Sequence, residues 1–188
     1  MKFEIRDLIA DDTHITQAGE ILHLAFVRDF PGSWATVEEG IEEVRELLTE
    51  ADAICRIAYH NGRVLGWIGG LPQYDGHVWE LHPLAVHPDW QGRGIGRALV
   101  QDLEAQVHNR GGLTIMLGSD DVSGMTSLGG VDLYPDPLAH LARIENRRQH
   151  PYGFYQKLGY CLLGVIPDAN GLGKPDILMG KRVSNQTV

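Results

Sequence analysis

The chain has 188 residues, of which 43% are hydrophobic, and its formal net charge at pH 7 is −9. This length and composition suit one compact domain, residues 1–188. The sequence has no apolar run that could span a bilayer, and it lacks the basic surface that nucleic-acid binding requires. Its two cysteines, Cys55 and Cys161, stand far apart among apolar neighbours, which indicates small buried side chains in a reducing compartment. We therefore expect a cytoplasmic protein with no membrane or nucleic-acid partner.

The first half of the chain predicts a strand, two helices and a hairpin. The opening residues alternate apolar and charged side chains, which is typical of a strand and unlike a secretion signal. Thr36 and Glu39 have the spacing of a capping box at the start of a helix. Asn61-Gly62 between two apolar runs is the strongest short hairpin signal. In chain order we expect a strand at Phe3 and Ile5, a helix from about 11 to 27, a helix over 37–48, and a hairpin within 54–70.

The second half alternates strands and helices. A strand over about 78–86 leads into a helix over about 94–109, which Gly111-Gly112 ends. Strands that begin antiparallel and then pass through a helical crossover indicate a mixed sheet of the α/β (α+β) class. The remaining elements that we expect are strands over 113–118, 160–167 and 176–183, a helix over 136–147 and a short helix over 151–159.

The segment "ELHPLAVHPDWQGRGIGRALV" combines a proline inside a strand with three glycines at alternate positions. Pro83 cannot donate to a sheet ladder, so it predicts a bulge or a place where neighbouring strands part. Backbone groups near Leu84 and Ala85 would then be available. The glycines remove side chains where the strand turns into a helix, so the N–H groups of residues 91–96 can approach an anion. The alternative is an ordinary glycine-rich turn between strand and helix.

Two common phosphate-binding motifs do not fit this loop. Gly92, Gly94 and Gly96 have the spacing G-x-G-x-G rather than the G-x-G-x-x-G of dinucleotide-binding folds, and no Lys-Ser/Thr pair follows as in a P-loop. The spacing therefore disfavours nicotinamide dinucleotides and nucleoside triphosphates as ligands.

The loop resembles the acetyl-coenzyme A loop of the GNAT N-acetyltransferase superfamily, whose pattern Gln/Arg-x-x-Gly-x-Gly/Ala follows a strand that ends in Val-x-Pro. Here the corresponding residues are Val86-His87-Pro88 and then 91–96. The stretches "WELHPLAV", "DLYPDPLAHLARIEN", "HPYGFYQKLGY" and "GVIPDANGLGKPDILMGKR" are similar to one branch, the aminoglycoside 6'-N-acetyltransferases. The similarity covers about 78–183, and Gly153 departs from it where the branch has an acidic residue.

This resemblance implies a fold and a set of roles. The fold would have a mixed, mostly antiparallel central sheet that is splayed at a bulge in its fourth strand and flanked by helices. The cofactor would be acetyl-CoA, a co-substrate, bound by Leu84, Ala85, Val86, Gln91, Gly92, Arg93, Gly94, Ile95, Gly96 and Tyr155. The catalytic residues would be Glu80 as base, His82 as its helper, the Leu84 N–H as oxyanion donor and Tyr155 as acid.

Glu80, His82 and Tyr155 also have alternative interpretations that involve no catalysis. Glu80 and His82 lie two apart on one face of a strand, where neighbours in the sheet could satisfy both. A zinc site at this pair lacks a third ligand at metal spacing, so no metal is expected. Tyr155 in "GFYQKLGY" could simply pack in the core.

The charge of the chain favours a cationic substrate. An aminoglycoside carries several ammonium groups, and carboxylates of Asp120 and Asp121 follow a predicted core strand. With Trp34 and Glu80 they form the predicted substrate site, and the branch resemblance implies a homodimer. The open alternatives are a GNAT enzyme for another amine, such as a polyamine, an amino acid or a protein N-terminus, and a non-catalytic acyl-CoA sensor.

Overall fold

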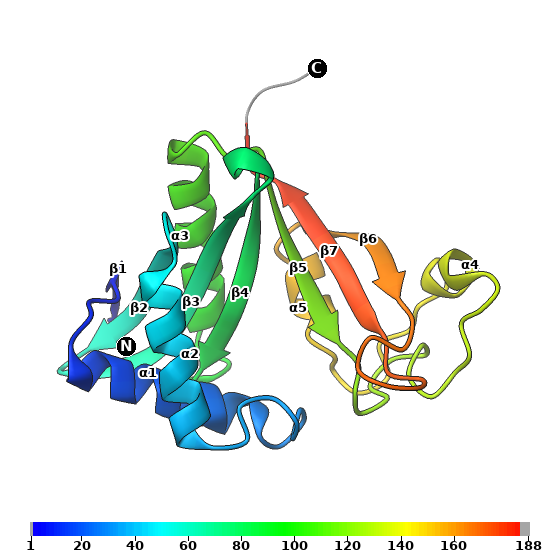
Figure 1. Cartoon of the computed structure of the whole chain (residues 1–188), viewed down its shortest axis with the longest axis horizontal. Coiled ribbons are helices and arrows are strands. Elements are labelled where there is room, and N and C mark those ends of the chain that lie inside the picture. Colours follow the sequence, from blue (N-terminus) through cyan, green and yellow to red (C-terminus); the bar gives the residue numbers. More distant parts are fainter. Residues whose placement is uncertain (1, 185–188) are drawn as a thin grey trace. The chain divides into compact units, whose positions relative to one another are not determined.

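A computed structural model describes residues 2–184 of the chain (Figure 1). These residues form two compact units. The first unit comprises residues 2–115 together with 183 and 184, and the second comprises Met116–Arg182. The single domain over 1–188 remains a prediction. Within residues 2–184, no helix combines the length and the hydrophobicity that crossing a membrane requires.

Four antiparallel strands form the sheet of the first unit: β1 (Glu4–Asp7), β2 (Ile54–His60), β3 (Arg63–Gln73) and β4 (Val78–Val86), in that order. Asn61 and Gly62 connect β2 to β3, and both have positive φ, 46° and 80°. His60 pairs with Arg63 across this turn. These values are those of a two-residue hairpin whose twist matches its strands, so the hairpin prediction is confirmed.

Three helices belong to the first unit: α1 (Asp12–Phe26), α2 (Val37–Thr49) and α3 (Ile95–Asn109). Asp11 caps α1 by accepting a hydrogen bond from the N–H of His14 at 3.0 Å. Thr36 caps α2 by accepting from the N–H of Glu39 at 3.2 Å. The Glu39 carboxylate accepts from Ala35 N–H rather than from Thr36, so only half of the predicted capping box forms.

Helices α2 and α3 pack on opposite faces of this sheet (Figure 1). Gly69 of β3 faces Leu47 of α2, whereas the next residue, Gly70, faces Leu103 of α3. Successive residues of a strand point to opposite faces, which explains this division. The main core lies on the α1 and α2 side and includes fully buried Leu22 and Trp67.

The second unit contains three strands and two short helices: β5 (Thr114–Asp120), which begins in the first unit, β6 (Cys161–Ile166), β7 (Asp176–Arg182), α4 (Pro137–Leu141) and α5 (Tyr152–Gln156). The strands follow the order β5-β7-β6, and β6 and β7 are antiparallel. The three predicted strands and the short helix are confirmed.

Two predictions are wrong in the second unit. The helix expected over 136–147 ends at Leu141, because the residues after it pair with another segment: Ser127 N–H donates to the Glu145 carbonyl at 3.0 Å, and Glu145 N–H donates to the Ser127 hydroxyl at 2.9 Å. Cys161 is exposed, because it begins strand β6 at the end of the strand order. Cys55 is half-buried, and burial raises the pKa of its thiol to about 11.

Candidate active site

Strand β4 has a β-bulge at Pro83. Opposite the single residue Gly69 of β3, strand β4 has two residues, His82 and Pro83. A Cβ at Gly69 would lie 2.2 Å from the His82 carbonyl oxygen, so the close approach of the two strands requires glycine there. The bulge that Pro83 predicts is confirmed.

Glu80 and His82 are half-buried on β4, just before the bulge. Glu80 pairs with Leu71, which packs against the core on the α1 and α2 side of the sheet. Beyond the bulge, Ala85 rather than Leu84 reaches this core, because the extra residue shifts the alternation of side chains by one. Glu80 and His82 therefore share the face that α1 and α2 cover.

A cluster of Trp34, Glu43 and His82 forms on this face. Nε1 of Trp34 donates to one carboxylate oxygen of Glu43 at 3.0 Å. The other Glu43 oxygen lies 3.3 Å from Nε2 of His82. The rings of Trp34 and His82 have centroids 5.8 Å apart and planes at 45°. Three segments, namely the loop before α2, helix α2 and strand β4, thus meet at one carboxylate.

The surroundings of Glu43 favour its charged form. The hydrogen bond with His82 is the main cause that lowers the pKa of this carboxyl, and the bond from Trp34 acts in the same direction. Partial burial opposes them without reversing the shift. Glu43 is therefore a carboxylate at neutral pH, and it can only accept hydrogen bonds.

The glycine loop at 91–96 is open and leads directly into α3. Gly92 and Gly94 have φ of 72° and 85°, a region that favours glycine, and no atom outside the loop lies within 4 Å of a Cβ built at either position. Gly94 O accepts from Ala98 N–H at 3.0 Å, which marks the helix start. The N–H groups of a first helical turn have no partner within the helix, so this loop fits an anion.

Side chains hold the predicted cofactor loop in shape without covering its glycines. Gln91 Nε2 donates to the Val86 carbonyl at 3.1 Å, and the Arg93 guanidinium donates to the Asp89 carbonyl at 3.2 Å. The Ile95 side chain is buried and anchors the first turn of α3. Gly92 and Gly94 are exposed.

Tyr155, predicted as the acid, lies on α5 of the second unit. Its ring packs edge-on against Phe154 and Tyr160, with centroids 5.1 and 5.6 Å away. The side chain is buried, and this burial raises the pKa of the phenol. The phenol therefore stays protonated at neutral pH.

Asp120 and Asp121 are both predicted to contact substrate, but they differ in burial and in hydrogen bonding. Asp120 is half-buried, and its carboxylate accepts from Asn170 Nδ2. Asp121 is 1% exposed, and its carboxylate accepts from Met125 N–H at 2.6 Å and from Thr126 N–H and hydroxyl at 2.9 and 2.7 Å. These three bonds occupy the Asp121 carboxylate inside its loop, so its position favours a structural role over substrate contact.

His150 ties the same loop to the segment before α5. Its Nε2 donates to the Asp120 carbonyl at 2.9 Å, and its Nδ1 accepts from Tyr152 N–H at 3.2 Å. Burial is the main cause that lowers the pKa of this imidazole, which is consistent with a neutral ring. Among residues 2–184, no group of three or more His, Cys, Asp or Glu side chains is placed to hold a metal ion.

Comparison with known proteins agrees with this geometry. The acetyltransferase (GNAT) family profile matches residues 20–124, more than half of the chain, from within α1 through β4 and α3. The chain belongs to the GNAT acetyltransferase family. An acetyltransferase of Pectobacterium atrosepticum is 38% identical over 96 residues, which are 49% of this chain and 64% of that protein. One of Yersinia pestis is 35% identical over 81 residues, 42% and 56% respectively. These alignments thus span less than two thirds of the curated relatives.

Solved structures resemble this GNAT acetyltransferase over nearly its whole length. An aminoglycoside 6'-N-acetyltransferase complexed with coenzyme A is 38% identical, with a TM-score of 0.88 over 98% of this chain and 99% of that one. The Enterococcus faecium enzyme of that name is 38% identical with a TM-score of 0.85 and the same coverage. The seven strands therefore belong to the mixed, mostly antiparallel sheet of the α+β GNAT fold, as predicted.

The GNAT resemblance did not identify Glu43. The structure brings Trp34 and His82 of the predicted site together, and Glu43 is the residue that joins them. One feature of the sequence points to Glu43: it is next to Val44, on the apolar side of α2. A carboxylate at such a position is half-buried in the structure. Tyr155 and Asp120 lie in the second unit.

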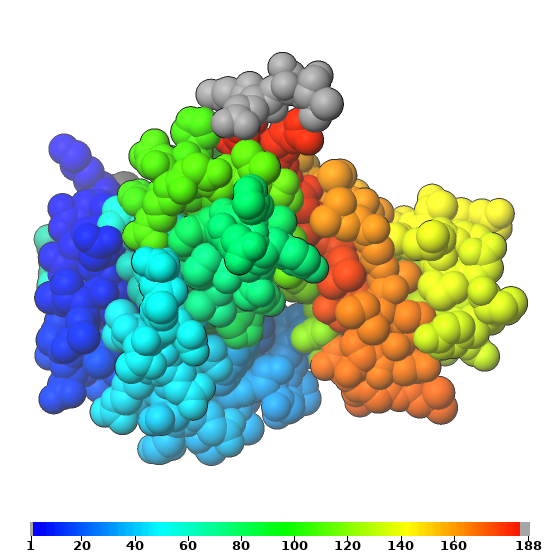
Figure 2. All heavy atoms as spheres, turned by 45° about the horizontal axis from the view of Figure 1, so that its top comes forward, coloured from blue at the N-terminus to red at the C-terminus, as the bar shows by residue number. Residues whose placement is uncertain are grey.

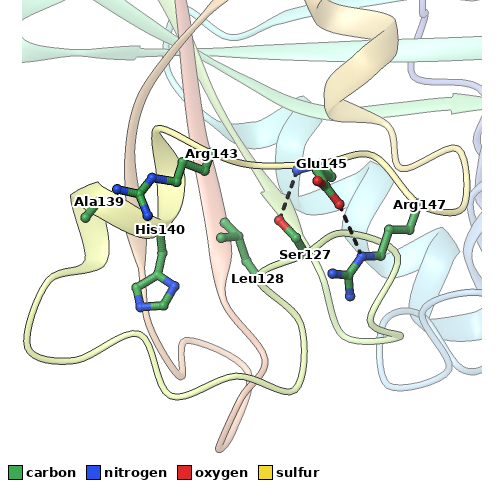
Figure 3. A pocket seen from close by; sticks show the side chains of 7 residues that line it. All are labelled: Ser127, Leu128, Ala139, His140, Arg143, Glu145 and Arg147. Carbon is green, nitrogen blue, oxygen red and sulfur yellow. Dashed lines mark hydrogen bonds and ion pairs between the residues drawn. The ribbon is translucent and has the colours of Figure 1, made fainter.

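The second unit of this GNAT acetyltransferase also has a hollow of about 250 Å³ outside the predicted site. Figure 3 shows Arg143 and His140 on one side of Leu128 and Arg147 on the other. Glu145 pairs with Arg147 at 3.8 Å. The segment around α4 lies at the surface (Figure 2, yellow). The hollow contains no predicted site residue.

Proposed function

We propose that this GNAT enzyme transfers the acetyl group of acetyl-CoA to an amine of a cationic small molecule, in particular the 6'-amino group of aminoglycosides, in a ternary complex. The observation that carries the proposal is the arrangement along one strand: Glu80 and His82 precede the β4 bulge, and the glycine loop follows at the start of α3. The full-length similarity to aminoglycoside 6'-N-acetyltransferases supports the choice of substrate.

The cofactor site that we propose uses backbone groups. The N–H groups of 92–96 would bind the pyrophosphate of acetyl-CoA, because the loop is open and the helix dipole favours an anion there. The N–H of Gln91 donates instead to the Pro88 carbonyl at 3.3 Å. Backbone groups of Leu84, Ala85 and Val86 would extend the site along β4 beyond the bulge, where ladder bonds with β3 are displaced.

The chemistry that we propose needs a base, an oxyanion donor and an acid. Acetyl-CoA supplies the thioester carbonyl that the amine attacks. Glu80, helped by His82, takes a proton from the amine directly or through water. The Leu84 N–H donates to the carbonyl oxygen as charge develops on it. The C–S bond breaks, and Tyr155, which burial keeps protonated, gives its proton to the thiolate.

The substrate contacts that we propose are Trp34, Glu80 and Asp120. Glu80 and Asp120 are half-buried carboxylates that can pair with ammonium groups. Buried Asp121 shapes the loop that follows Asp120 instead of meeting the substrate. We further propose a homodimer in the cytoplasm, which light scattering at micromolar concentration tests; a monomer would contradict the dimer.

The substrate class is tested by thiol release from acetyl-CoA with kanamycin, spermidine and a peptide compared side by side. We expect kcat/KM to be highest with kanamycin. Preference for spermidine or the peptide would support a GNAT enzyme for another amine. Acetyl-CoA binding without thiol release in any arm would support the acyl-CoA sensor.

The Glu80→Gln variant tests the base. It keeps the size and hydrogen-bonding reach of the side chain but removes its basicity, so we expect kcat at neutral pH to fall by about 10²-fold. The acidic limb of the wild-type pH profile should disappear. If Glu80 merely holds an ammonium group, the loss will appear in KM for the amine, and the limb will remain.

A further inference from the structure

We infer that Glu43 is a positioning residue for this acetyl transfer, which fixes the tautomer and the orientation of His82. The inference rests on the function proposed above for the β4 site. Its basis is the cluster of Trp34, Glu43 and His82, in which one carboxylate contacts both rings at 3.0 and 3.3 Å.

The direction of both hydrogen bonds follows from the charge of Glu43. The carboxylate only accepts, and Trp34 Nε1–H only donates, so their bond has one possible direction. For the same reason the His82 ring must donate through Nε2–H to the second oxygen. The neutral ring of His82 therefore carries its proton on Nε2 and has its acceptor lone pair on Nδ1.

The cluster also fixes the plane of the His82 ring. The side chain of His82 is 40% exposed, and that of Glu43 is 23% exposed, so the bond is partly shielded from water. The Trp34 ring lies against the imidazole in a tilted contact, with centroids 5.8 Å apart and planes at 45°. A half-exposed histidine would otherwise sample several rotamers, and the contact with α2 selects one.

This tautomer suits the proposed chemistry. His82 shares a strand face with Glu80, and Nδ1 as an acceptor can take a hydrogen bond from the substrate amine or from a water that carries its proton to Glu80. If the proton reaches His82, the Glu43 carboxylate stabilises the charged ring, as the acidic member of a catalytic triad does for its histidine.

A purely structural role for Glu43 would be different. The carboxylate would then only join α2 to β4, and any group that keeps this link would preserve activity. The Glu43→Gln variant separates the two roles. Its amide oxygen can still accept from Trp34, but its NH₂ faces His82 Nε2 and requires an unprotonated nitrogen there, which moves the proton of the neutral ring to Nδ1.

The experiment combines ring spectroscopy with kinetics. In ¹⁵N-histidine-labelled protein at about pH 8.5, where unperturbed histidines are neutral, we expect the His82 signals, assigned with His82→Asn, to report the Nε2–H tautomer. Glu43→Gln should convert them to Nδ1–H. With the best amine, kcat should fall at least about 10-fold while KM for acetyl-CoA stays constant.

Two further variants complete the test. Glu43→Asp retains the charge and should keep the wild-type tautomer and more activity than Glu43→Gln. Glu46→Gln makes the same charge change at an exposed position of α2 and should alter neither readout. Unchanged His82 ring signals or unchanged kcat in folded Glu43→Gln would overturn the inference. The ring measurement needs no substrate, so absence of thiol release with every amine would count against the proposed function instead.

Discussion

Both units bury apolar side chains, but the buried polar side chains are concentrated in the second unit. The first unit closes a core of α1, α2 and its sheet around apolar residues such as Leu22 and Trp67. Of the five buried polar or charged residues within the described part of the chain, four lie in the second unit: Ser119, Asp121, Thr126 and His150. Asp121 and Thr126 accept hydrogen bonds from backbone N–H groups of the connection between β5 and α4, and His150 donates to the Asp120 carbonyl at the end of β5.

This difference shows two ways of holding functional groups in place. In the first unit, Glu80, His82 and the glycine loop sit on or beside regular elements whose backbone bonds are made internally. In the second unit, a long connection with little regular structure needs buried side chains to satisfy its backbone. Apolar truncation should therefore damage the first unit most, and loss of a buried polar group should damage the second most.

The largest effect that we expect is that of Leu22→Ala in the first unit. Leu22 is fully buried in the core, so its truncation should lower the free energy of unfolding by about 4 kcal/mol. Urea denaturation measures this loss. Leu24→Ala on the same helix is the control, because Leu24 is 43% exposed and should cost far less. Similar losses in both variants would contradict the assignment of the core.

Asp121→Ala should have a comparable but smaller effect in the second unit. The change leaves two buried donors of Thr126 and a half-buried donor of Met125 without their acceptor, which should cost about 3 kcal/mol. The control is Asp132→Ala, which removes an exposed carboxylate that accepts one bond from Tyr134 N–H. Urea denaturation measures the free energy of unfolding of both variants. A loss for Asp121→Ala no greater than that for Asp132→Ala would contradict the structural role of Asp121.

Gly94→Val tests the cofactor loop of the first unit. Its φ of 85° strains any residue with a Cβ, and the added side chain would stand in the open loop, so acetyl-CoA affinity should fall at least about 10-fold, or 1.4 kcal/mol. Calorimetry measures the affinity. Gly111→Val is the matched control: Gly111 lies just beyond the other end of α3 with φ of 81° and equally open surroundings. Equal affinities in the two folded variants would exclude the loop as the pyrophosphate site.

The smallest effect that we expect is the contribution of His150 to the pH dependence of stability. Burial lowers the pKa of His150 in the folded chain, although the carboxylates of Asp120 and Asp121 oppose this shift. As the pH falls below the ordinary value of 6.5, the unfolded chain gains a proton first, so stability decreases down to the folded pKa. Thermal unfolding at several pH values should show a weaker loss in His150→Gln than in wild type. His108→Gln, at an exposed position, should behave like wild type.

The sequence predicts the first unit better than the second for a physical reason. Helix and strand periodicity and the Asn61-Gly62 turn are local signals, and the regular elements there obey them. The residues after Leu141 also have a helical pattern, but pairing of Glu145 with Ser127, 18 residues away, replaces the helix. Pairing between residues so far apart produces no signal in the local sequence.

Prediction of the candidate site from the sequence has the same limit, because local signals do not show contacts between distant residues. Pro83 and the glycines predict the bulge and the loop from the sequence. Proline always lacks the backbone N–H, and glycine always tolerates positive φ, whatever the rest of the fold. Glu43 meets His82 from 39 residues away, so only the fold brings them together. Nothing in the sequence distinguishes Asp120 from Asp121, since the turn after β5 decides which carboxylate points inward.

The β4 bulge also limits how the gene can change in length here. Deleting one residue at 82–83 would leave a single residue opposite Gly69 and remove the bulge, while Leu84 would still pair with Ile68 and Ala85 with Trp67. The methyl group of Ala85 would therefore stay in the core that it shares with Trp67. Deleting one residue from the regular part of the strand, between the bulge and Val86, would instead turn the side chains that follow to the opposite face. A one-codon deletion at the bulge would thus remove only the displaced backbone between Glu80 and the glycine loop, whereas the same deletion further along would exchange the two faces of the strand end.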